Sequence, residues 1–210
     1  DVVEQVARAL AKTHGVETLA LAADLVEEGA CEQAVRSAEE RFGKIDVLVP
    51  NAGGPPAGAV DAIDDATWRR AFELTFLTTV RLARAALPGM AARKWGRVVV
   101  IGSGSMVAPI PNLATSSGLR PGLVGVIKLF AERHAKDGVT VNIAAPGYIR
   151  TERLAEIGTR HNATAAQVAL KWLLDQGGVA AIPKASRRES QQANFDALTI
   201  SLDDADRKKI

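Results

Sequence analysis

Ile45-Asp-Val-Leu-Val-Pro-Asn-Ala-Gly-Gly54 is the stretch of sequence that decides the fold. The apolar residues up to Val49 are typical of a strand buried in a parallel sheet, and the asparagine and glycines after Pro50 indicate a turn at its end. A second apolar run, Arg97-Val-Val-Val-Ile101, has the same character. Segments with apolar residues at helical spacing flank both runs. Strands that alternate with helices predict a parallel sheet covered by helices on both faces.

The same alternation extends over the whole chain. We expect helices at residues 1–13, 30–42, 64–93, 116–136, 164–176, 189–198 and 203–210. We expect strands at residues 18–22, 45–50, 97–102, 139–144 and 179–183. The prediction is therefore a single three-layer α/β domain over residues 1–210, with a mainly parallel sheet of about five strands.

Three of the expected helices begin with a capping signal. Asp64 or Asp65 is placed to cap the long helix, because a carboxylate there accepts a hydrogen bond from a free backbone N–H of the first turn. Thr164-Ala-Ala-Gln167 has the spacing of a capping box. Ser201 is expected to cap the last helix, with Asp204 three residues further on.

Composition places the chain among folded globular proteins and excludes several function classes. The 210 residues are 47% hydrophobic and 24% charged, which is not the composition of a disordered chain. Lys and Arg number 26 against 24 Asp and Glu, a net charge of +2. This balance excludes a nucleic-acid binder that relies on bulk positive charge. No apolar run approaches the length of about 18 residues that a membrane-spanning helix needs.

Cysteine and histidine usage argues against a metal site. Cys31 is the single cysteine, which excludes an intramolecular disulfide and a cysteine-built metal site. His14, His134 and His161 are scattered without metal-ligand spacing. We therefore expect no metal. Because no signal peptide is recognisable, we expect a cytoplasmic location.

Residues 1–154 resemble a short-chain dehydrogenase/reductase, a Rossmann-type family that uses NAD(H) or NADP(H). The resemblance rests on segments that occur in the family's order, namely Asp24 after the strand at 18–22, Ile45–Gly53, Gly96–Ser103 and Pro146–Thr151. It implies NAD or NADP as cofactor and implies these cofactor-binding residues: Asp24, Asn51, Ala52, Gly53, Pro146, Gly147, Ile149 and Thr151. Two alternatives stay open: Asn51–Gly53 ends a strand and nothing more, and Asp24 caps a helix over 25–42.

The catalytic positions of the family are altered in this chain. The family works with Asn, Ser, Tyr and Lys, and the resemblance places Thr75, Ser103, Ser116 and Arg120 at those positions. Leu113–Gly122 resembles a divergent subgroup with Ser and Arg there. A serine hydroxyl lacks the acidity of a tyrosine, and Arg120 stays protonated, so it supplies charge and hydrogen bonds but moves no proton. We interpret these residues as catalytic or, alternatively, as inherited scaffold.

The chain also lacks a counterpart of the family's first strand and its glycine-rich loop. In the family, backbone amides of that loop hold the cofactor pyrophosphate at a helix N-terminus. Gly102-Ser-Gly104 follows a strand, but the resemblance makes it part of the active-site loop.

Residues 155–210 resemble the C-terminal part of an aldo-keto reductase, a family of TIM barrels. The resemblance runs through Ala155–Leu174, Val179–Ser186, Ala193–Ala197 and Ser201–Asp204. It implies that Lys184, Ser186, Arg187 and Asn194 hold the adenosine phosphate of NADP. The alternative is that Lys184, Arg187 and Arg188 are solvated charges, which is the more common role of such side chains. The chain is thus interpreted as a chimera joined near residues 154–160, in which the tail packs on the sheet.

Two functions from different classes are expected from these observations. The first is an NAD(P)-dependent oxidoreductase-type protein for a small carbonyl or hydroxyl substrate, with weak or no carbonyl reductase activity. The alternative is a non-enzymatic chimeric or engineered protein built from oxidoreductase fragments; a nucleotide-binding module without chemistry is the third reading. The helices 65–93 and 116–136 resemble the pair through which the family forms oligomers, and an open sheet edge recruits other chains, so a homo-oligomer is expected. No nucleic acid and no membrane are expected as partners.

Overall fold

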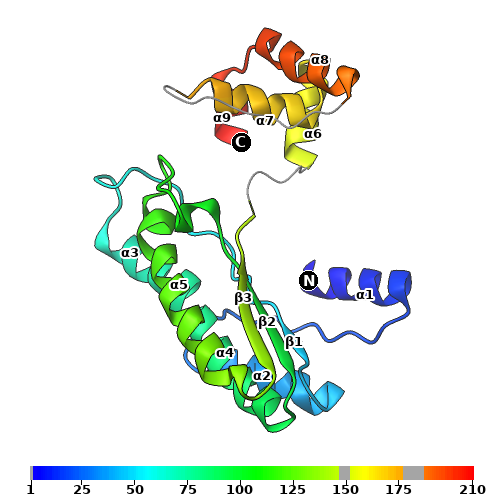
Figure 1. The fold of residues 1–210 in the computed structure, drawn as a ribbon, viewed down its shortest axis with the longest axis vertical. Coiled ribbons are helices and arrows are strands. Elements are labelled where there is room, and N and C mark those ends of the chain that lie inside the picture. Colours follow the sequence, from blue (N-terminus) through cyan, green and yellow to red (C-terminus); the bar gives the residue numbers. More distant parts are fainter. Residues whose placement is uncertain (1, 147–151, 177–186) are drawn as a thin grey trace. The chain divides into compact units, whose positions relative to one another are not determined.

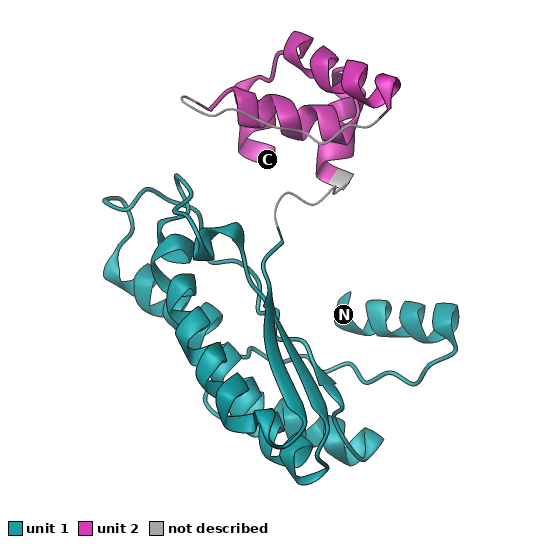
Figure 2. Cartoon of the chain, in the orientation of Figure 1, with its two compact units in different colours: residues 1–147 teal, residues 148–210 magenta. Residues whose placement is uncertain are grey.

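The computed structural model describes residues 2–146, 152–176 and 187–210. The chain divides into two compact units, residues 1–147 and 148–210 (Figure 2). The expectation that the whole chain packs as a single domain stays a prediction. Among the described residues, none of the helices combines the length and the apolar character needed to cross a bilayer.

The first unit is built on a parallel sheet. It holds β1 (Val47–Leu48), β2 (Gly96–Ile101) and β3 (Val139–Ala144) in the order β1-β2-β3. Val47 lies opposite Arg97, and Val98 lies opposite Val141. The unit therefore has the expected α/β, Rossmann-like fold. The strands near 97–102 and 139–144 are confirmed, whereas the strand expected at 45–50 is shorter.

One expected strand is not formed. Residues 18–22 have no regular secondary structure, and no described strand lies beside them to exchange hydrogen bonds. An apolar run becomes a strand only when a neighbour satisfies its backbone N–H and C=O groups, so the prediction for 18–22 is wrong for this reason. The strand expected at 179–183 lies outside the described residues.

Helices pack on one face of the sheet (Figure 1). These are α2 (Ala30–Phe42), α4 (Thr78–Ala92) and α5 (Ala114–Ala135). On the opposite face Val47 and Val49 are each 54% exposed. α1 (Val2–His14) has no buried residue. Among the described residues of this unit, the helix layer expected on that second face is therefore not formed.

The long predicted helix is one continuous rod with a π-helical turn inside it. α3 (Asp65–Phe72) leads into a π-helical turn (Glu73–Leu77), and α4 follows directly. The Thr67 backbone N–H donates to the Asp64 carboxylate at 2.8 Å, so Asp64 and not Asp65 is the cap. Pro88 lies inside α4 without ending it.

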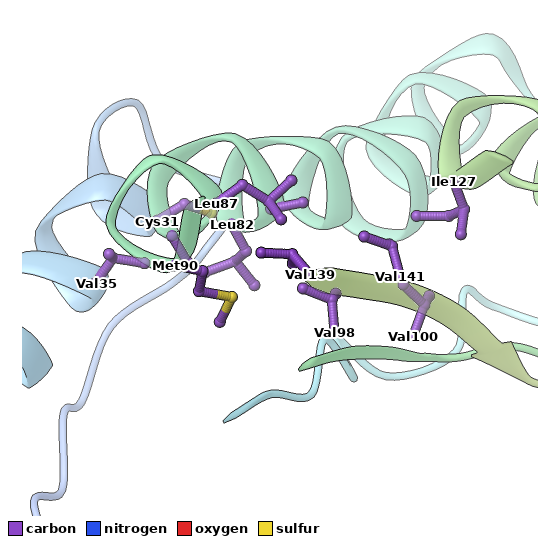
Figure 3. Packing of buried hydrophobic residues seen from close by; sticks show 12 residues of the cluster. Cys31, Val35, Leu82, Leu87, Met90, Val98, Val100, Ile127, Val139 and Val141 are labelled. Carbon is purple, nitrogen blue, oxygen red and sulfur yellow. The ribbon is translucent and has the colours of Figure 1, made fainter. Parts of the chain in front are cut away.

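The core of this unit lies between the helices and the covered sheet face (Figure 3). Leu82, Leu87 and Met90 of α4 pack against valines of β2 and β3. Cys31 and Val35 of α2 join them from the other side. Burial of each such side chain contributes about 1.5–3 kcal/mol, so this face holds the unit together.

The second unit is helical in its described part. It contains α6 (Glu152–Arg160), α7 (Ala165–Leu174), α8 (Arg188–Asp196) and α9 (Asp204–Lys209). A separate apolar core includes Leu154, Ile157, Val168, Ile200 and Leu202. The capping box of Thr164 with Gln167 is confirmed.

The cap predicted for the last helix is wrong by two residues. Asp203 and not Ser201 is the cap, and Asp206 completes a capping box with it. Asp206 is fully buried and contacts Arg160 Nη1 and His161 Nε2, each at 2.6 Å. The capping box therefore places the helix start at Asp203, and the same buried carboxylate contacts two residues far away in the chain.

Candidate functional site

A serine cluster lies where β2 and β3 end. The Gly102 N–H donates to the Ala144 carbonyl at 2.7 Å and ties the two strand ends together. Ser103 is extended, and its Oγ accepts from the Ser105 N–H at 3.2 Å. The short 3-10 helix (Gly104–Met106) that follows turns the chain back toward α5.

Ser116 is directed into this cluster from the first turns of α5. Its Oγ lies 2.9 Å from Ser105 Oγ, and both residues are buried. The sequence analysis singled out Ser103 and Ser116 but missed Ser105. The only sequence signal for Ser105 is its place two residues after Ser103, because its partner is eleven residues away on another element.

Arg120 joins three segments at this edge of the sheet. It lies on α5, and its Nη1 donates to the Ile101 carbonyl at 3.3 Å while Nη2 donates to the Gly53 carbonyl at 3.2 Å. Its Nε is buried without a hydrogen-bond partner. Burial lowers the pKa of the Arg120 guanidinium from its usual value. The structure thus brings together Gly53, Ser103, Ser116 and Arg120.

Thr75 is not joined to the serine cluster by a hydrogen bond. It is buried in the π-helical turn, and its Oγ1 donates to the Ala71 carbonyl at 2.7 Å. A threonine hydroxyl inside a helix commonly bonds the carbonyl four residues earlier. The hydroxyl of Thr75 is therefore engaged by its own helix.

The turn of Asn51, Ala52 and Gly53 follows β1 and is open. Gly53 has φ +79°, a conformation that favours glycine. A Cβ built on Gly53 or Gly54 would meet no atom within 4 Å. The turn therefore leaves room for a ligand at the carboxyl edge of the sheet.

Asp24 lies on the exposed loop before α2 and has a partner that the sequence did not indicate. Arg70 Nη2 on α3 contacts its Oδ2 at 2.7 Å, and the Val26 N–H donates to its Oδ1 at 3.1 Å. The hydrogen bond from Arg70 holds the pKa of the Asp24 carboxyl below its ordinary value. Asp24 does not cap a helix over 25–42, because α2 begins at Ala30 after Gly29.

The remaining cofactor candidates divide between described and undescribed segments. Pro146 follows β3, at the edge of the sheet where the serine cluster lies. Gly147, Ile149, Thr151, Lys184 and Ser186 lie outside the described residues. Arg187 and Asn194 belong to the second unit, at the cap and within α8. In the described ranges, no three His, Cys, Asp or Glu side chains lie close enough to share a metal ion.

Two family models match overlapping parts of the chain. The model described as short chain dehydrogenase matches residues 1–162. The model described as aldo/keto reductase family matches residues 131–210. The join predicted at residues 154–160 lies inside the overlap of the two matches.

Known relatives are similar to the chain over different lengths. Over 143 residues it is 34% identical to 2,3-dihydroxy-2,3-dihydro-p-cumate dehydrogenase of Pseudomonas putida, covering 68% of this chain and 55% of that protein. Over 202 residues it is 26% identical to acetoacetyl-CoA reductase of Paracoccus denitrificans, covering 96% of this chain and 78% of that protein.

A solved structure has a similar fold. This is an NADH-dependent reductase complexed with NAD, matched with a TM-score of 0.57 at 26% identity. The match covers 61% of this chain and 56% of that one. The chain therefore spans little more than half the length of this structure and of the Pseudomonas relative.

Proposed function

Because the chain belongs to the short chain dehydrogenase family, we propose that it is an NAD(P)-dependent oxidoreductase-type protein for a small carbonyl or hydroxyl substrate. The observation that carries this proposal is the position of Arg120, which joins the Gly53 turn to the end of β2 next to Ser103. Ligands of open α/β sheets bind at the carboxyl ends of the strands. This position supports the proposal that the chain keeps the framework of the family's site.

The described residues fit a nicotinamide cofactor at this edge. The turn of Asn51, Ala52 and Gly53 would hold one side of it, and Pro146 after β3 would hold another. Asp24 would hold the adenine end, which requires it to share or release Arg70. When bound, such a cofactor donates or accepts a hydride. Both NAD and NADP are consistent with this assignment.

The chain's own side chains supply only part of what the reduction of a carbonyl substrate needs. Ser103 can donate a hydrogen bond to a carbonyl oxygen, because its Oγ is used only as an acceptor by the Ser105 N–H. Ser116 is bonded to Ser105, and a serine pair contains no acid that titrates near neutral pH. Loss of a positioned acid typically lowers a rate by about 10²–10⁴-fold. We therefore expect weak or no carbonyl reductase activity.

The second candidate function is a non-enzymatic chimera of oxidoreductase fragments. The second unit has its own apolar core, and its residues fall within the aldo/keto reductase match. The alignment with acetoacetyl-CoA reductase argues against a separate origin of the second unit, because it extends over 96% of the chain. Under this proposal Arg187 and Asn194 are solvated residues of a structural tail.

A cofactor-binding and turnover experiment decides between the two functions. Thermal unfolding is followed with and without NADP(H) and NAD(H). A ligand at about 100 times its dissociation constant stabilises the folded state by about 2.7 kcal/mol. Oxidation of NADPH is then assayed with reactive aldehydes and diketones, using the unmodified chain and Ser103→Ala.

The oxidoreductase proposal predicts a cofactor-dependent shift of the melting temperature and slow turnover that Ser103→Ala reduces further. No shift at millimolar cofactor would favour the non-enzymatic chimera. Rapid turnover that Ser103→Ala abolishes would contradict the expected weakness and establish a competent enzyme.

A further inference from the structure

Arg120 carries a positive charge that no carboxylate of the described residues compensates. It is half-buried, and its described hydrogen bonds go only to the carbonyl oxygens of Ile101 and Gly53. Among the side chains that the structure describes, no acidic group forms an ion pair with it, and burial is the cause of its lowered pKa. By contrast, Arg81 is also largely buried, and Glu73 lies 2.8 Å from its Nη1.

A half-buried guanidinium without a counter-ion is less favourable than a paired one, because charges removed from water are stabilised by a partner of opposite charge. Two carbonyl dipoles offset part of this charge, but the Nε–H still lacks an acceptor. Each terminal nitrogen of Arg120 also carries a second N–H beyond the one it donates to a carbonyl. No described residue is recorded as accepting from these hydrogens. The second N–H groups of Nη1 and Nη2, and not the buried Nε–H, therefore leave donor capacity for an anionic oxygen.

The position of this charge points to a ligand. Ile101 ends β2 and Gly53 follows β1, so Arg120 sits at the carboxyl ends of the parallel strands. Ser103, two residues beyond Ile101, retains a hydroxyl hydrogen for a second contact. The planar guanidinium matches the two oxygens of a carboxylate better than a single-point cation does.

We infer that Arg120, together with Ser103, binds the carboxylate of a small oxo acid or hydroxy acid. Where the protein acts as an enzyme, its substrate is then an anion; this part rests on the proposed function, whereas anion binding itself does not. Arg120 becomes a residue that determines specificity as well as a link between segments.

The test compares an acid with its neutral ester in the absence of cofactor. Binding of pyruvate and of methyl pyruvate to the full chain is measured by saturation-transfer NMR at fixed ionic strength. Inorganic phosphate is the third probe. A hydrogen bond to a charged group is worth enough for about a tenfold or greater preference for pyruvate. The unmodified chain is expected to show this preference.

Arg120→Gln is expected to abolish the preference, and Arg120→Lys is expected to weaken it. The matched control is Arg97→Gln, because Arg97 also donates to two backbone carbonyls, those of Gly96 and Gly138, at the other end of the sheet. The control is expected to leave pyruvate binding unchanged. Far-UV circular dichroism checks that each variant folds.

Equal binding of pyruvate and methyl pyruvate by the unmodified chain would overturn the inference, and this result needs no variant. An equal loss of pyruvate binding in Arg97→Gln would also overturn it. Binding of phosphate without binding of pyruvate would overturn it as well. Pyruvate binding without any cofactor binding would contradict the proposed function but support this inference. Turnover of neutral ketones as fast as of oxo acids would support the proposed function but contradict this inference.

Discussion

At the scale of single residues, Asp24 shows how a distant partner changes the chemistry of a side chain. Its hydrogen bond from Arg70 lowers the pKa of the carboxyl. A carboxylate whose pKa is lower in the folded than in the unfolded state stabilises the fold above its unfolded pKa. This contribution is lost as the pH falls through the lowered folded pKa. The contact therefore matters at neutral pH and disappears in acid.

Removing the partner of Asp24 should raise the pKa of that carboxyl. We expect Arg70→Gln to shift the Asp24 titration upward toward its ordinary value near 3.8. Arg69→Gln is the matched control, because the neighbouring Arg69 pairs with Asp65 instead. NMR titration of the Asp24 carboxyl carbon measures both. An unchanged Asp24 midpoint in Arg70→Gln would refute the ion pair.

A second residue-scale prediction concerns the buried carboxylate of the second unit. Asp206→Asn leaves Arg160 and His161 without the charge that they contact at 2.6 Å. Each hydrogen bond to a charged group contributes about 1.5–3 kcal/mol, and Arg160 is partly exposed to water, so we expect a loss in this range. Urea unfolding of the variant measures the loss. Asp204→Asn, in the same helix without a recorded ion pair, should change stability by less than about 0.5 kcal/mol; a similar loss there would contradict this account.

At the scale of elements, the packing of α4 on β2 depends on the absence of a side chain. A Cβ at Gly96 would lie 2.5 Å from atoms of Met90, which is fully buried in the core. We expect Gly96→Ala to destabilise the chain by about 1–3 kcal/mol, because the helix and strand must separate. Thermal or urea unfolding measures the change.

Gly125→Ala is the matched control for that packing. A Cβ on this exposed glycine of α5 would meet no atom within 4 Å, and alanine is favoured over glycine inside a helix by about 0.5–1 kcal/mol. We expect this variant to be stabilised. An equal change in the stability of the two variants would contradict the claim that packing against Met90 requires glycine at position 96.

At the scale of the whole molecule, we predict self-association through the helix pair of α3–α4 and α5. Leu129 on α5 is 67% exposed, and burying such a side chain against another chain is favourable by about 1.5–3 kcal/mol. We expect Leu129→Glu to lower the molar mass measured by light scattering at micromolar concentrations. Leu198→Glu, at a leucine 53% exposed in the second unit, should leave it unchanged. A monomeric unmodified chain would contradict the prediction.

The sequence by itself determined the elements whose signals are local. Apolar residues at helical spacing predicted α2, the long α3–α4 rod and α5, and apolar runs predicted β2 and β3. The capping box at Thr164 depends on four consecutive residues, so it was predictable as well. The grouping of Gly53, Ser103, Ser116 and Arg120 followed from a resemblance whose motifs occur in the chain in the family's order.

Only the tertiary structure decided the features that depend on a partner far away in the chain. The run at 18–22 has strand composition, but among the described residues no strand lies beside it to pair with its backbone. The contacts of the buried Asp206 with Arg160 and His161 join residues more than 40 positions apart in the chain. The hydroxyl of Ser116 contacts that of Ser105. Arg120 donates to backbone carbonyls, and among the described residues no carboxylate pairs with it. Local pattern specifies which element forms; hydrogen-bond and charge partners are specified only when the folded chain brings distant residues together.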